Sequence, residues 1–303
     1  MKVSFTEEVR SAVVSGRPIV ALESTIIAHG MPFPQNLEMA REVERVIRKG
    51  NAIPATIAII DGVLRAGLSD SELQHFARTG PSIPKVSTRD IPFAVAKGTT
   101  GATTVASTMR IAALSGIHVF ATGGIGGAHR GADSTFDISN DLHEFGISNV
   151  AVVTAGAKAI LDLPITLEVL EANGVPVVGF GTDEFPAFYS RDSGLKVPMR
   201  LDDPGQVAEM MRAKWSLGLG GGIVVACPIP LTDEIPAAEI EPHILRALAD
   251  AKTQGIVGKN VTPYLLKRIT EFTGGRSLTA NIALVMNNAR VAAQIAVAFA
   301  QSR

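Results

Sequence analysis

The stretch PIVALESTIIAHGMPFPQNLEMAREVERVIRKGNAIPATIAIID, residues 18–61, decides the fold class. Its two ends, 18–25 and 54–61, are short runs rich in Ile, Val, Ala and Thr, which is typical of strands that are buried on both faces. Between them, residues 35–49 place apolar and charged side chains at the spacing of an amphipathic helix, and Gly50 stands at the C′ position that usually ends one. The stretch therefore predicts a strand, a helix and a second strand.

The same alternation continues along the rest of the chain. Further strand-like runs are at 118–124, 150–156, 175–180 and 222–229. Further helical segments are at 69–79, 104–115, 203–217, 236–254 and 279–301. Apolar strands that alternate with amphipathic helices indicate a three-layer α/β/α architecture with a mostly parallel central sheet. Because no linker or repeat divides the chain, we predict one domain over residues 1–303, with 181–204 as the alternative boundary.

Composition excludes several classes of protein. The chain has 28 Lys and Arg against 29 Asp and Glu, so it has no surplus positive charge to hold a nucleic acid. A single cysteine excludes an intrachain disulfide, and the N-terminus lacks a signal-peptide pattern, so we expect a cytoplasmic protein. Two uncharged stretches, 111–128 and 215–232, approach the length of a membrane span, but Gly and Pro interrupt them. We expect buried strands there, and no membrane partner.

A glycine-rich stretch, TGGIGGAHRGADSTFDISNDL at 122–142, carries most of the polar signal. Its glycines allow a ligand to approach the backbone closely, although the spacing fits neither a dinucleotide fingerprint nor a P-loop. Its polar residues include His129, Arg130, Asp133, Asp137, Ser139, Asn140 and Asp141. Asp137 or Asp141 can supply the carboxylate that a hard divalent cation prefers. Helix capping and turn formation explain the same residue types equally well.

Residues capable of chemistry follow several predicted strands, where α/β proteins usually place their sites. Burial of Glu23 raises its pKa and suits it to proton transfer, unless backbone hydrogen bonds hold it as a structural group. Lys158 follows a very apolar strand, which disfavours the charged amine and favours a Schiff-base nucleophile; the alternatives are a lysine that reaches solvent or binds phosphate. Cys227 has no electropositive neighbours in sequence, which indicates a buried structural thiol.

Two other features suggest ligand contacts. Lys85 and Arg89, together with the small polar run at 98–108, resemble an anion cradle of cations, hydroxyls and amides, although such runs also begin ordinary helices. Three asparagines, Asn281, Asn287 and Asn288, lie in a predicted helix, where Asn is a poor helix former. We infer that at least one of them has another role, such as base recognition through its amide.

Together these motifs resemble a known family. ALESTIIAHGMPFPQN, GATTVASTM, FATGGIGGAHRGADSTFDISNDL, AGAKAILDL and TGGRSLTANIALVMNNA are similar, in this order, to the pseudouridine-5′-phosphate glycosidase family, which includes the indigoidine synthase A-like proteins. The resemblance runs from about Pro18 to Ala298. It implies a Mn²⁺-dependent enzyme that reversibly splits the C–C glycosidic bond of pseudouridine 5′-phosphate into uracil and ribose 5-phosphate, and a homotrimer with an α/β/α core.

The resemblance also assigns roles to individual residues. It implies that Lys158 is the Schiff-base nucleophile, Glu23 the proton donor and Asp137 the metal ligand, with Asp141 as a weaker candidate for the metal. The residues that it implies for contacts with the substrate are Lys85, Val105, Ser139, Asn140 and Asp141, with His129 and Asn281 as further candidates. The less typical stretch at 181–200 is expected to lie away from the catalytic motifs, at a rim or lid.

Two alternatives remain open at this point. A related lysine-imine enzyme acting on another phosphosugar would also use Lys158 and Lys85 but would not depend on uracil. A non-catalytic sensor of nucleotides or phosphosugars would bind its ligand with Lys158 charged and inert. Borohydride trapping of a covalent lysine adduct separates the sensor from both enzymes.

Overall fold

The computed structural model describes residues 3–256, 258 and 261–301. The strands of its large sheet are β1 (Ser4–Phe5), β2 (Ile19–Glu23), β3 (Ile53–Ile60), β4 (Val63–Ala66), β5 (Lys85–Val86), β6 (Gly101–Thr103), β7 (Val119–Ala121), β9 (Ala151–Thr154), β11 (Val177–Phe180), β12 (Met199–Leu201) and β13 (Ile223–Ala226). The main order is β1-β4-β3-β2-β7-β9-β13-β11-β12, and β6 and β5 extend from β3. From β3 to β12 neighbouring strands are parallel, whereas β4 and β6 run antiparallel to β3. The mostly parallel sheet is thereby confirmed.

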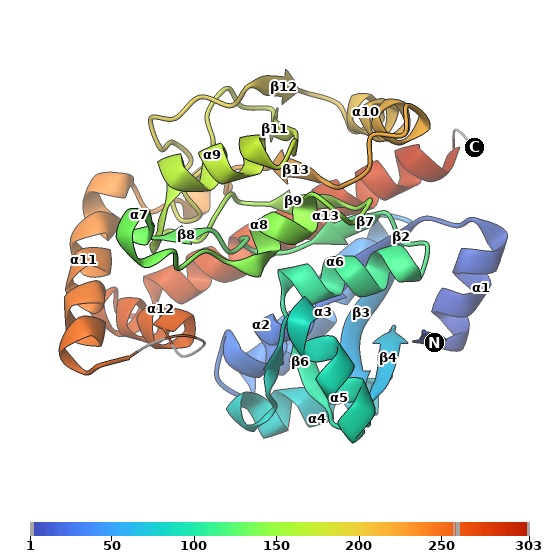
Figure 1. Cartoon of the computed structure of the whole chain (residues 1–303), viewed down its shortest axis with the longest axis horizontal. Helices are drawn as coiled ribbons and strands as arrows, with labels where there is room; N and C mark the ends of the chain where they lie inside the picture. Colours follow the sequence, from blue (N-terminus) through green and yellow to red (C-terminus); the bar gives the residue numbers. More distant parts are fainter. Residues whose placement is uncertain (1–2, 257, 259–260, 302–303) are drawn as a thin grey trace.

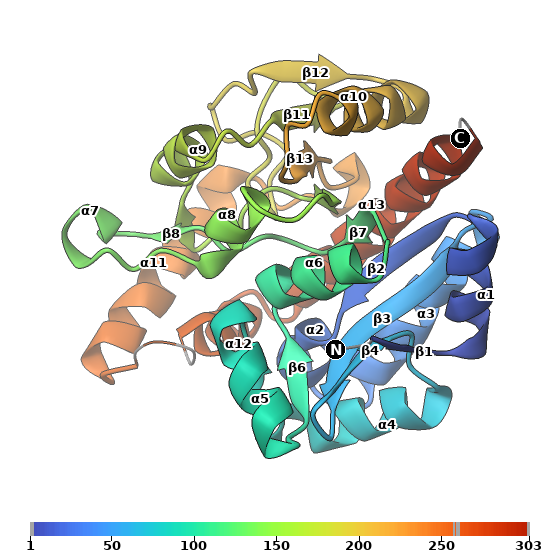
Figure 2. The ribbon, with the colours of Figure 1, turned by 45° about the vertical axis from the view of Figure 1, so that its right-hand side comes forward.

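Helices cover both faces of this sheet. They are α1 (Glu7–Ser15), α2 (Thr25–His29), α3 (Gln35–Lys49), α4 (Asp70–Thr79), α5 (Ile91–Lys97), α6 (Val105–Leu114), α7 (Ala132–Thr135), α8 (Asn140–Phe145), α9 (Leu163–Ala172), α10 (Pro204–Ser216), α11 (Ala237–Thr253), α12 (Val261–Phe272) and α13 (Arg276–Gln301). Helix α13 packs across β2, β7 and β9, with α3 and α10 beside it, and it passes behind the strands in Figure 1. Helix α6 packs on β2, β3 and β4 and lies in front of them in Figure 2. This is the predicted α/β/α arrangement.

The elements expected from sequence are present, and their strands are shorter than the apolar runs except for β3, which is as long as its run and begins one residue earlier. The run at 118–124 gives only β7, because Thr122 and the glycines after it leave the sheet. The uncharged stretches at 111–128 and 215–232 contain β7 and β13, which are buried strands, as expected. The helices that lie outside the predicted helical segments are α1, α2, α5, α7, α8, α9 and α12.

Helix α13 is long and apolar enough, by length and composition, to cross a membrane. Half of its most apolar window is buried inside the protein, where it packs against the sheet. The apolar composition of α13 is therefore accounted for by its place in the core.

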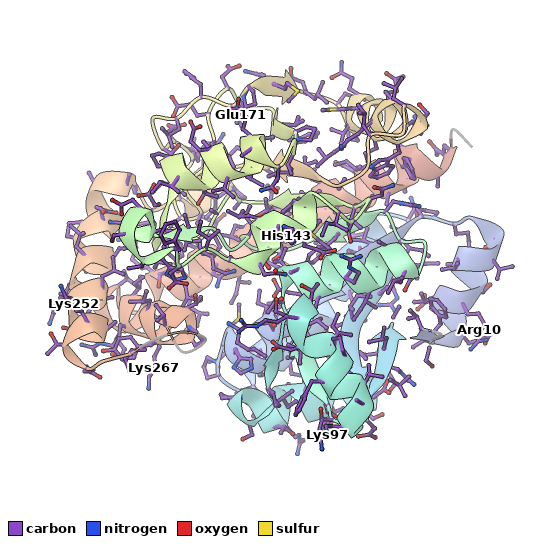
Figure 3. The ribbon with its side chains drawn as sticks, viewed as in Figure 1. Arg10, Lys97, His143, Glu171, Lys252 and Lys267 are labelled. Carbon is purple, nitrogen blue, oxygen red and sulfur yellow. The ribbon has the colours of Figure 1, made fainter. Side chains whose placement is uncertain are left out.

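Exposed charged side chains lie at the periphery of the molecule, as Figure 3 shows for Arg10, Lys97 and Lys252.

The end of α3 differs in detail from the expectation for Gly50. The helix ends at Lys49, as predicted, but Gly50 has φ −82°, and the left-handed residue is Asn51, with φ 62°. Glycine is required at position 50 for another reason. A Cβ there would lie 2.7 Å from the Cβ of Ala293 on α13, so the absence of a side chain lets the two helices pack closely.

This close approach predicts that Gly50→Ala lowers the free energy of unfolding by about 1–3 kcal/mol, because the added methyl group overpacks the contact between α3 and α13. The control is Gly220→Ala, where the nearest atom to a new Cβ is 3.8 Å away. Urea denaturation of the two variants measures the difference. Equal stability of both variants contradicts the role assigned to the α3–α13 contact.

Candidate active site

The carboxyl ends of β2, β7 and β9 open into a cleft of about 710 Å³. Because these three strands are adjacent and parallel, the residues that follow them meet at one edge of the sheet. All ten residues predicted from sequence for the site line this cleft: Glu23, Lys85, Val105, His129, Asp137, Ser139, Asn140, Asp141, Lys158 and Asn281. The structure therefore brings the predicted set together, and the chemical role of each member stays a prediction.

Glu23 is the last residue of β2 and is 8% exposed. Burial raises its pKa, as predicted, and the nearby Lys158 ammonium and a hydrogen bond from Thr122 offset part of the rise. That hydrogen bond runs from Thr122 Oγ1 to Glu23 Oε1 over 2.5 Å. Within the described residues no backbone N–H donates to this carboxylate, so the alternative of a backbone-held structural glutamate finds no support. A buried carboxyl with a raised pKa suits proton transfer.

Lys158 lies on the loop after β9 and is half-buried. Its backbone N–H donates to the Ile125 carbonyl over 3.1 Å, and the N–H of Ile125 donates to the Gly156 carbonyl over 3.1 Å. Gly156 has φ +86°, and a Cβ there would lie 2.0 Å from the Pro186 carbonyl oxygen, so only glycine fits. The loop that carries Lys158 is thus fixed against the glycine-rich loop after β7.

Asp141 joins two further walls of the cleft. Its Oδ1 accepts from the N–H of Ala106 in the first turn of α6, and its Oδ2 accepts from the N–H of Gly126, both over 2.8 Å. Ser139 is the N-cap of α8, because its side chain accepts from the N–H of Asp141. Ser139 therefore caps a helix and Asp141 joins two backbone segments, as the structural alternative predicted. These roles do not exclude contact with a ligand.

The Lys85 side of the cleft has the features of an anion cradle. Strand β5, which begins with Lys85, pairs with β6, and β6 leads into α6, whose first residue is Val105. Ser107 Oγ donates to the Val86 carbonyl over 2.6 Å and ties β5 to the same helix end. Arg89 also lines the cleft. A helix N-terminus beside cationic side chains favours binding of a phosphate group.

The remaining predicted residues differ in whether their polar groups have hydrogen-bond partners within the described chain. His129, in strand β8 (Ala128–His129), is held by its backbone, whose N–H donates to the Asp137 carbonyl over 2.9 Å. Asn140 donates its side-chain amide to Thr88 Oγ1. Asn281, on α13, is 6% exposed, and its Oδ1 is buried without a hydrogen-bond partner among the described residues. A buried acceptor of this kind is suited to receive an N–H from a ligand.

The fit to a metal ion depends on Asp137. No group of three or more His, Cys, Asp and Glu side chains within residues 3–256, 258 and 261–301 is arranged to hold a metal. Asp141 already accepts two amide hydrogen bonds, whereas the exposed Asp137 carboxylate has no hydrogen-bond or ion-pair partner in the part of the chain described. One carboxylate suits a hard divalent cation that takes its other ligands from a phosphorylated substrate and water. The residues therefore fit a cation that is shared with the substrate.

The segment at 181–200 corrects one expectation. It was predicted to lie away from the catalytic motifs, yet Phe188 lines the cleft and packs over Gly124. The N–H of Phe188 donates to the Ala155 carbonyl over 2.9 Å, and its φ of 65° is unusual for a residue other than glycine. No sequence pattern marks a phenylalanine for this conformation, so the place of Phe188 in the site could not be predicted.

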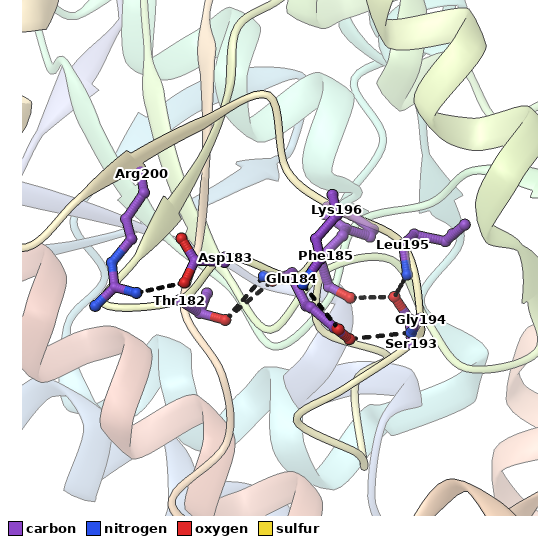
Figure 4. Close-up of polar contacts among 9 residues, drawn as sticks. All are labelled: Thr182, Asp183, Glu184, Phe185, Ser193, Gly194, Leu195, Lys196 and Arg200. Carbon is purple, nitrogen blue, oxygen red and sulfur yellow. Dashed lines mark hydrogen bonds and ion pairs between the residues drawn. The ribbon is translucent and has the colours of Figure 1, made fainter.

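Polar contacts fix the rest of this segment, as Figure 4 shows. Glu184 accepts from the N–H of Gly194 and from Lys196, and Arg200 pairs with Asp183 over 2.6 Å. These contacts hold the segment in one conformation around Phe188.

Cys227 lies outside the cleft lining and is 3% exposed. Burial raises the pKa of its thiol to about 12, and the Asn287 side chain donates to its Sγ over 3.2 Å. The expected buried structural thiol is confirmed.

Comparison with known proteins places this cleft in a family. The model of the family described as indigoidine synthase A like protein matches residues 8–298. A pseudouridine-5′-phosphate glycosidase of Deinococcus radiodurans is 59% identical over 294 residues, which cover 97% of this chain and 94% of the relative. A protein of the same name from Solibacter usitatus is 58% identical over 296 residues, which cover 98% and 99% of the two chains.

Two solved structures share the fold. The prealnumycin C-glycosynthase AlnA, crystallised in complex with ribulose 5-phosphate, has a TM-score of 0.91 and 41% identity, with 99% of this chain and 97% of that chain covered. An indigoidine synthase A-like protein from Thermotoga maritima has a TM-score of 0.88 and 38% identity, with 97% and 95% covered. Both likenesses extend over nearly the whole chain.

The raised pKa of Glu23 has a consequence for stability. Between the unfolded pKa, near 4.5, and the higher folded pKa, the folded protein binds more protons at this residue, so ionisation of Glu23 lowers stability as pH rises. We expect Glu23→Gln to melt at a higher temperature than the parent protein, by a margin that grows from pH 4 to pH 8. Calorimetry measures this margin, with Glu171→Gln on the exposed face of α9 as the control. A margin independent of pH contradicts the prediction.

Proposed function

The chain belongs to the indigoidine synthase A-like family, and on that premise we propose that it reversibly cleaves the C–C glycosidic bond of pseudouridine 5′-phosphate, giving uracil and ribose 5-phosphate. The observation that carries the proposal is the juxtaposition of Glu23 and Lys158 in one cleft with the Lys85 anion cradle. The high identity to proteins named for this reaction supports it, as does the fold shared with a C-glycosynthase that binds a pentose phosphate.

Lys158 supplies the covalent step of the proposed mechanism. In the direction of synthesis, its neutral amine condenses with the C1′ aldehyde of open-chain ribose 5-phosphate, releases water and forms an iminium. C5 of uracil attacks C1′, and the electron pair of the C=N bond moves to the lysine nitrogen. The sugar hydroxyl that closes the furanose ring then displaces the lysine amine from C1′. Cleavage is the reverse sequence and consumes one water.

Glu23 moves the proton in this scheme. When uracil has attacked, C5 carries both a hydrogen and the new bond to C1′, and the Glu23 carboxylate accepts that hydrogen as a proton. In cleavage, the protonated Glu23 returns the proton to C5, so that uracil departs as a neutral molecule. Burial raises the pKa of the carboxyl and so favours the protonated form, which the cleavage direction requires.

Other walls of the cleft hold the two ends of the substrate. We assign the phosphate to Lys85 and the N-terminus of α6 at Val105, where positive charge and helix amides coincide. We assign the base to Asn281, because its buried Oδ1 lacks a partner within the described chain and uracil offers N–H donors. Ser139, Asn140, Asp141 and His129 also line the cleft and are proposed to contact the sugar.

The proposal includes Mn²⁺ held by Asp137. When bound, this ion would offset the negative charge of the phosphate and orient the sugar hydroxyls. The exposed Asp137 carboxylate is available to hold it, whereas Asp141 already accepts from the amides of Ala106 and Gly126. A homotrimeric assembly and a cytoplasmic location belong to the same proposal.

Purified protein incubated with uracil, ribose 5-phosphate and Mn²⁺ is expected to form pseudouridine 5′-phosphate, detected by mass and chromatography. Lys158→Ala is expected to lose at least 10³-fold in rate, because it lacks the amine that forms the iminium. Borohydride is expected to trap ribose 5-phosphate on the parent protein but not on this variant. Lys97→Ala, on the exposed face of α5, is the matched control.

Each outcome of that experiment has a distinct meaning. Lack of product from folded parent protein, with a borohydride adduct still formed, favours another phosphosugar reaction. Lack of both product and adduct favours a sensor. Product formation by Lys158→Ala at the parental rate refutes the imine mechanism.

The metal assignment predicts that Asp137→Asn weakens Mn²⁺ binding about tenfold or more in the presence of ribose 5-phosphate, because the amide lacks the negative charge that a hard cation prefers. Titration calorimetry and the Mn²⁺ electron paramagnetic resonance signal measure this binding without turnover. Asp133→Asn, an exposed carboxylate on the neighbouring α7, is the control and is expected to bind like the parent. Equal affinities for Asp137→Asn and the parent overturn the assignment.

A further inference from the structure

Asn288 is a buried polar residue for which the proposed reaction gives no role. It lies on α13, is 0% exposed, and is absent from the lining of the cleft. Its Nδ2 donates to the Thr122 carbonyl over 2.7 Å and approaches the Gly123 carbonyl at 3.4 Å. Both acceptors belong to the turn that leaves β7 for the glycine-rich loop. Asn288 therefore does not line the cleft itself, but it holds the backbone of Thr122 and Gly123, which do.

The orientation of this amide is determined by its neighbours. Two backbone carbonyls face one end of the side chain, and a carbonyl can only accept, so that end must be the NH₂ group. The Oδ1 at the other end is buried without a partner among the residues that the structure describes. An unsatisfied buried acceptor is costly, so a residue retained under this penalty is expected to serve a purpose that an apolar side chain cannot serve.

The turn that Asn288 holds is the one that contacts Glu23. Thr122 is 3% exposed, and its N–H donates to the Val153 carbonyl on β9 over 3.0 Å. Its own carbonyl accepts a hydrogen bond from the Asn288 amide. With both backbone groups fixed, its Oγ1 reaches Glu23 Oε1 at 2.5 Å. Oε1 is thereby occupied as an acceptor, whereas Oε2 accepts no hydrogen bond within the described chain. As long as the Thr122 hydroxyl donates to Oε1 in this way, a proton on the carboxyl group resides on Oε2.

We propose that Asn288 is a positioning residue that acts through Thr122 to fix which oxygen of Glu23 carries the transferred proton. The chain of contacts runs from the Asn288 amide to the Thr122 carbonyl, and from the Thr122 hydroxyl to Glu23 Oε1. This assignment rests on the proposed function in one respect, namely that Glu23 exchanges a proton with the substrate. The geometric part, that Asn288 controls the protonation of Glu23 through Thr122, does not depend on the substrate.

Other groups also act on Glu23 and must be held constant in any test. The charged groups that influence it are Lys158 on the loop after β9, Asp141 on α8 and Lys85 on β5. The Thr122 hydrogen bond favours the carboxylate form, so its loss is expected to raise the pKa of Glu23 further. The Asn288 amide donates to the Thr122 and Gly123 carbonyls, so Asn288 variants are expected to leave the three charged residues in place.

The test follows the titration of Glu23 itself in the protein without substrate, by ¹³C nuclear magnetic resonance of glutamate carboxyl groups, with Glu23→Gln to assign the signal. Thr122→Val is expected to raise the titration midpoint by about one pH unit, because a hydrogen bond to a charged group is lost. Thr122→Ser is expected to restore the parental midpoint. Asn288→Leu and the smaller Asn288→Ala are expected to shift it in the same direction as Thr122→Val, by an equal or smaller amount.

The pH dependence of the reaction supplies a second readout. In synthesis, where Glu23 accepts a proton, the acid limb of kcat/KM is expected to move to higher pH in Thr122→Val and in both Asn288 variants. Because the two residues act in series, Asn288→Leu combined with Thr122→Val is expected to behave like Thr122→Val alone. The control is Asn287→Leu, the adjacent helix position, whose amide donates to the Pro228 carbonyl instead.

The outcomes separate this proposal from the proposed function. A parental Glu23 midpoint in folded Asn288→Leu or Asn288→Ala overturns the positioning role, whatever the reaction. Additive effects of the Asn288 and Thr122 changes also overturn it, because they show independent action. Shifted midpoints in a protein that makes no pseudouridine 5′-phosphate support the contact chain and refute only the substrate assignment.

Discussion

The register of three parallel strands is the constraint on which the site depends. Leu22 of β2 lies opposite Ala121 of β7, so the next residues along lie side by side: Glu23, the last residue of β2, and Thr122, the first residue after β7. Strand β7 is paired in turn with β9, which leads to the loop of Lys158. Side chains alternate between the two faces of a strand, so a slip of one residue between β2 and β7 would separate the Glu23 carboxyl from the Thr122 hydroxyl that contacts it. The apolar strand residues thus position a polar site by fixing where the strands end.

The loops beyond these strand ends are built around close backbone contacts. Gly156 fits beneath the Pro186 carbonyl, and Gly126 lies where a Cβ would be 2.3 Å from Ser139 Oγ. Asp141 then joins the Gly126 amide to the first turn of α6. These contacts order a glycine-rich loop that would otherwise be mobile, and they do so with groups that also face the cleft. Structural and ligand-binding roles are therefore combined in the same residues.

Much of this arrangement could be predicted from sequence, for physical reasons. Apolar runs and amphipathic spacing depend on local burial, so β2, β3 and α3 were located closely, and the residues after the strands followed from the parallel topology. The place of Phe188 could not be predicted, because it depends on a left-handed backbone and on a contact with Gly124. Helix α12 was missed, and three of its residues, Thr262, Pro263 and Leu266, line the cleft. The two amide hydrogen bonds that Asp141 accepts, from Ala106 and Gly126, could not be predicted either, because they are tertiary contacts.

The position of α13 in the chain has a consequence for how the protein is made. This helix follows every strand of the sheet in sequence, yet it covers β2, β7 and β9 and carries both Asn281 and Asn288. During synthesis on the ribosome the strands emerge first, and β2, β7 and β9 lack the covering that α13 gives them until residues 276–301 have left the exit tunnel. The nascent chain therefore passes through a stage in which part of one apolar face is exposed and the cleft is incomplete. Burial of that surface and completion of the cleft depend on the same helix.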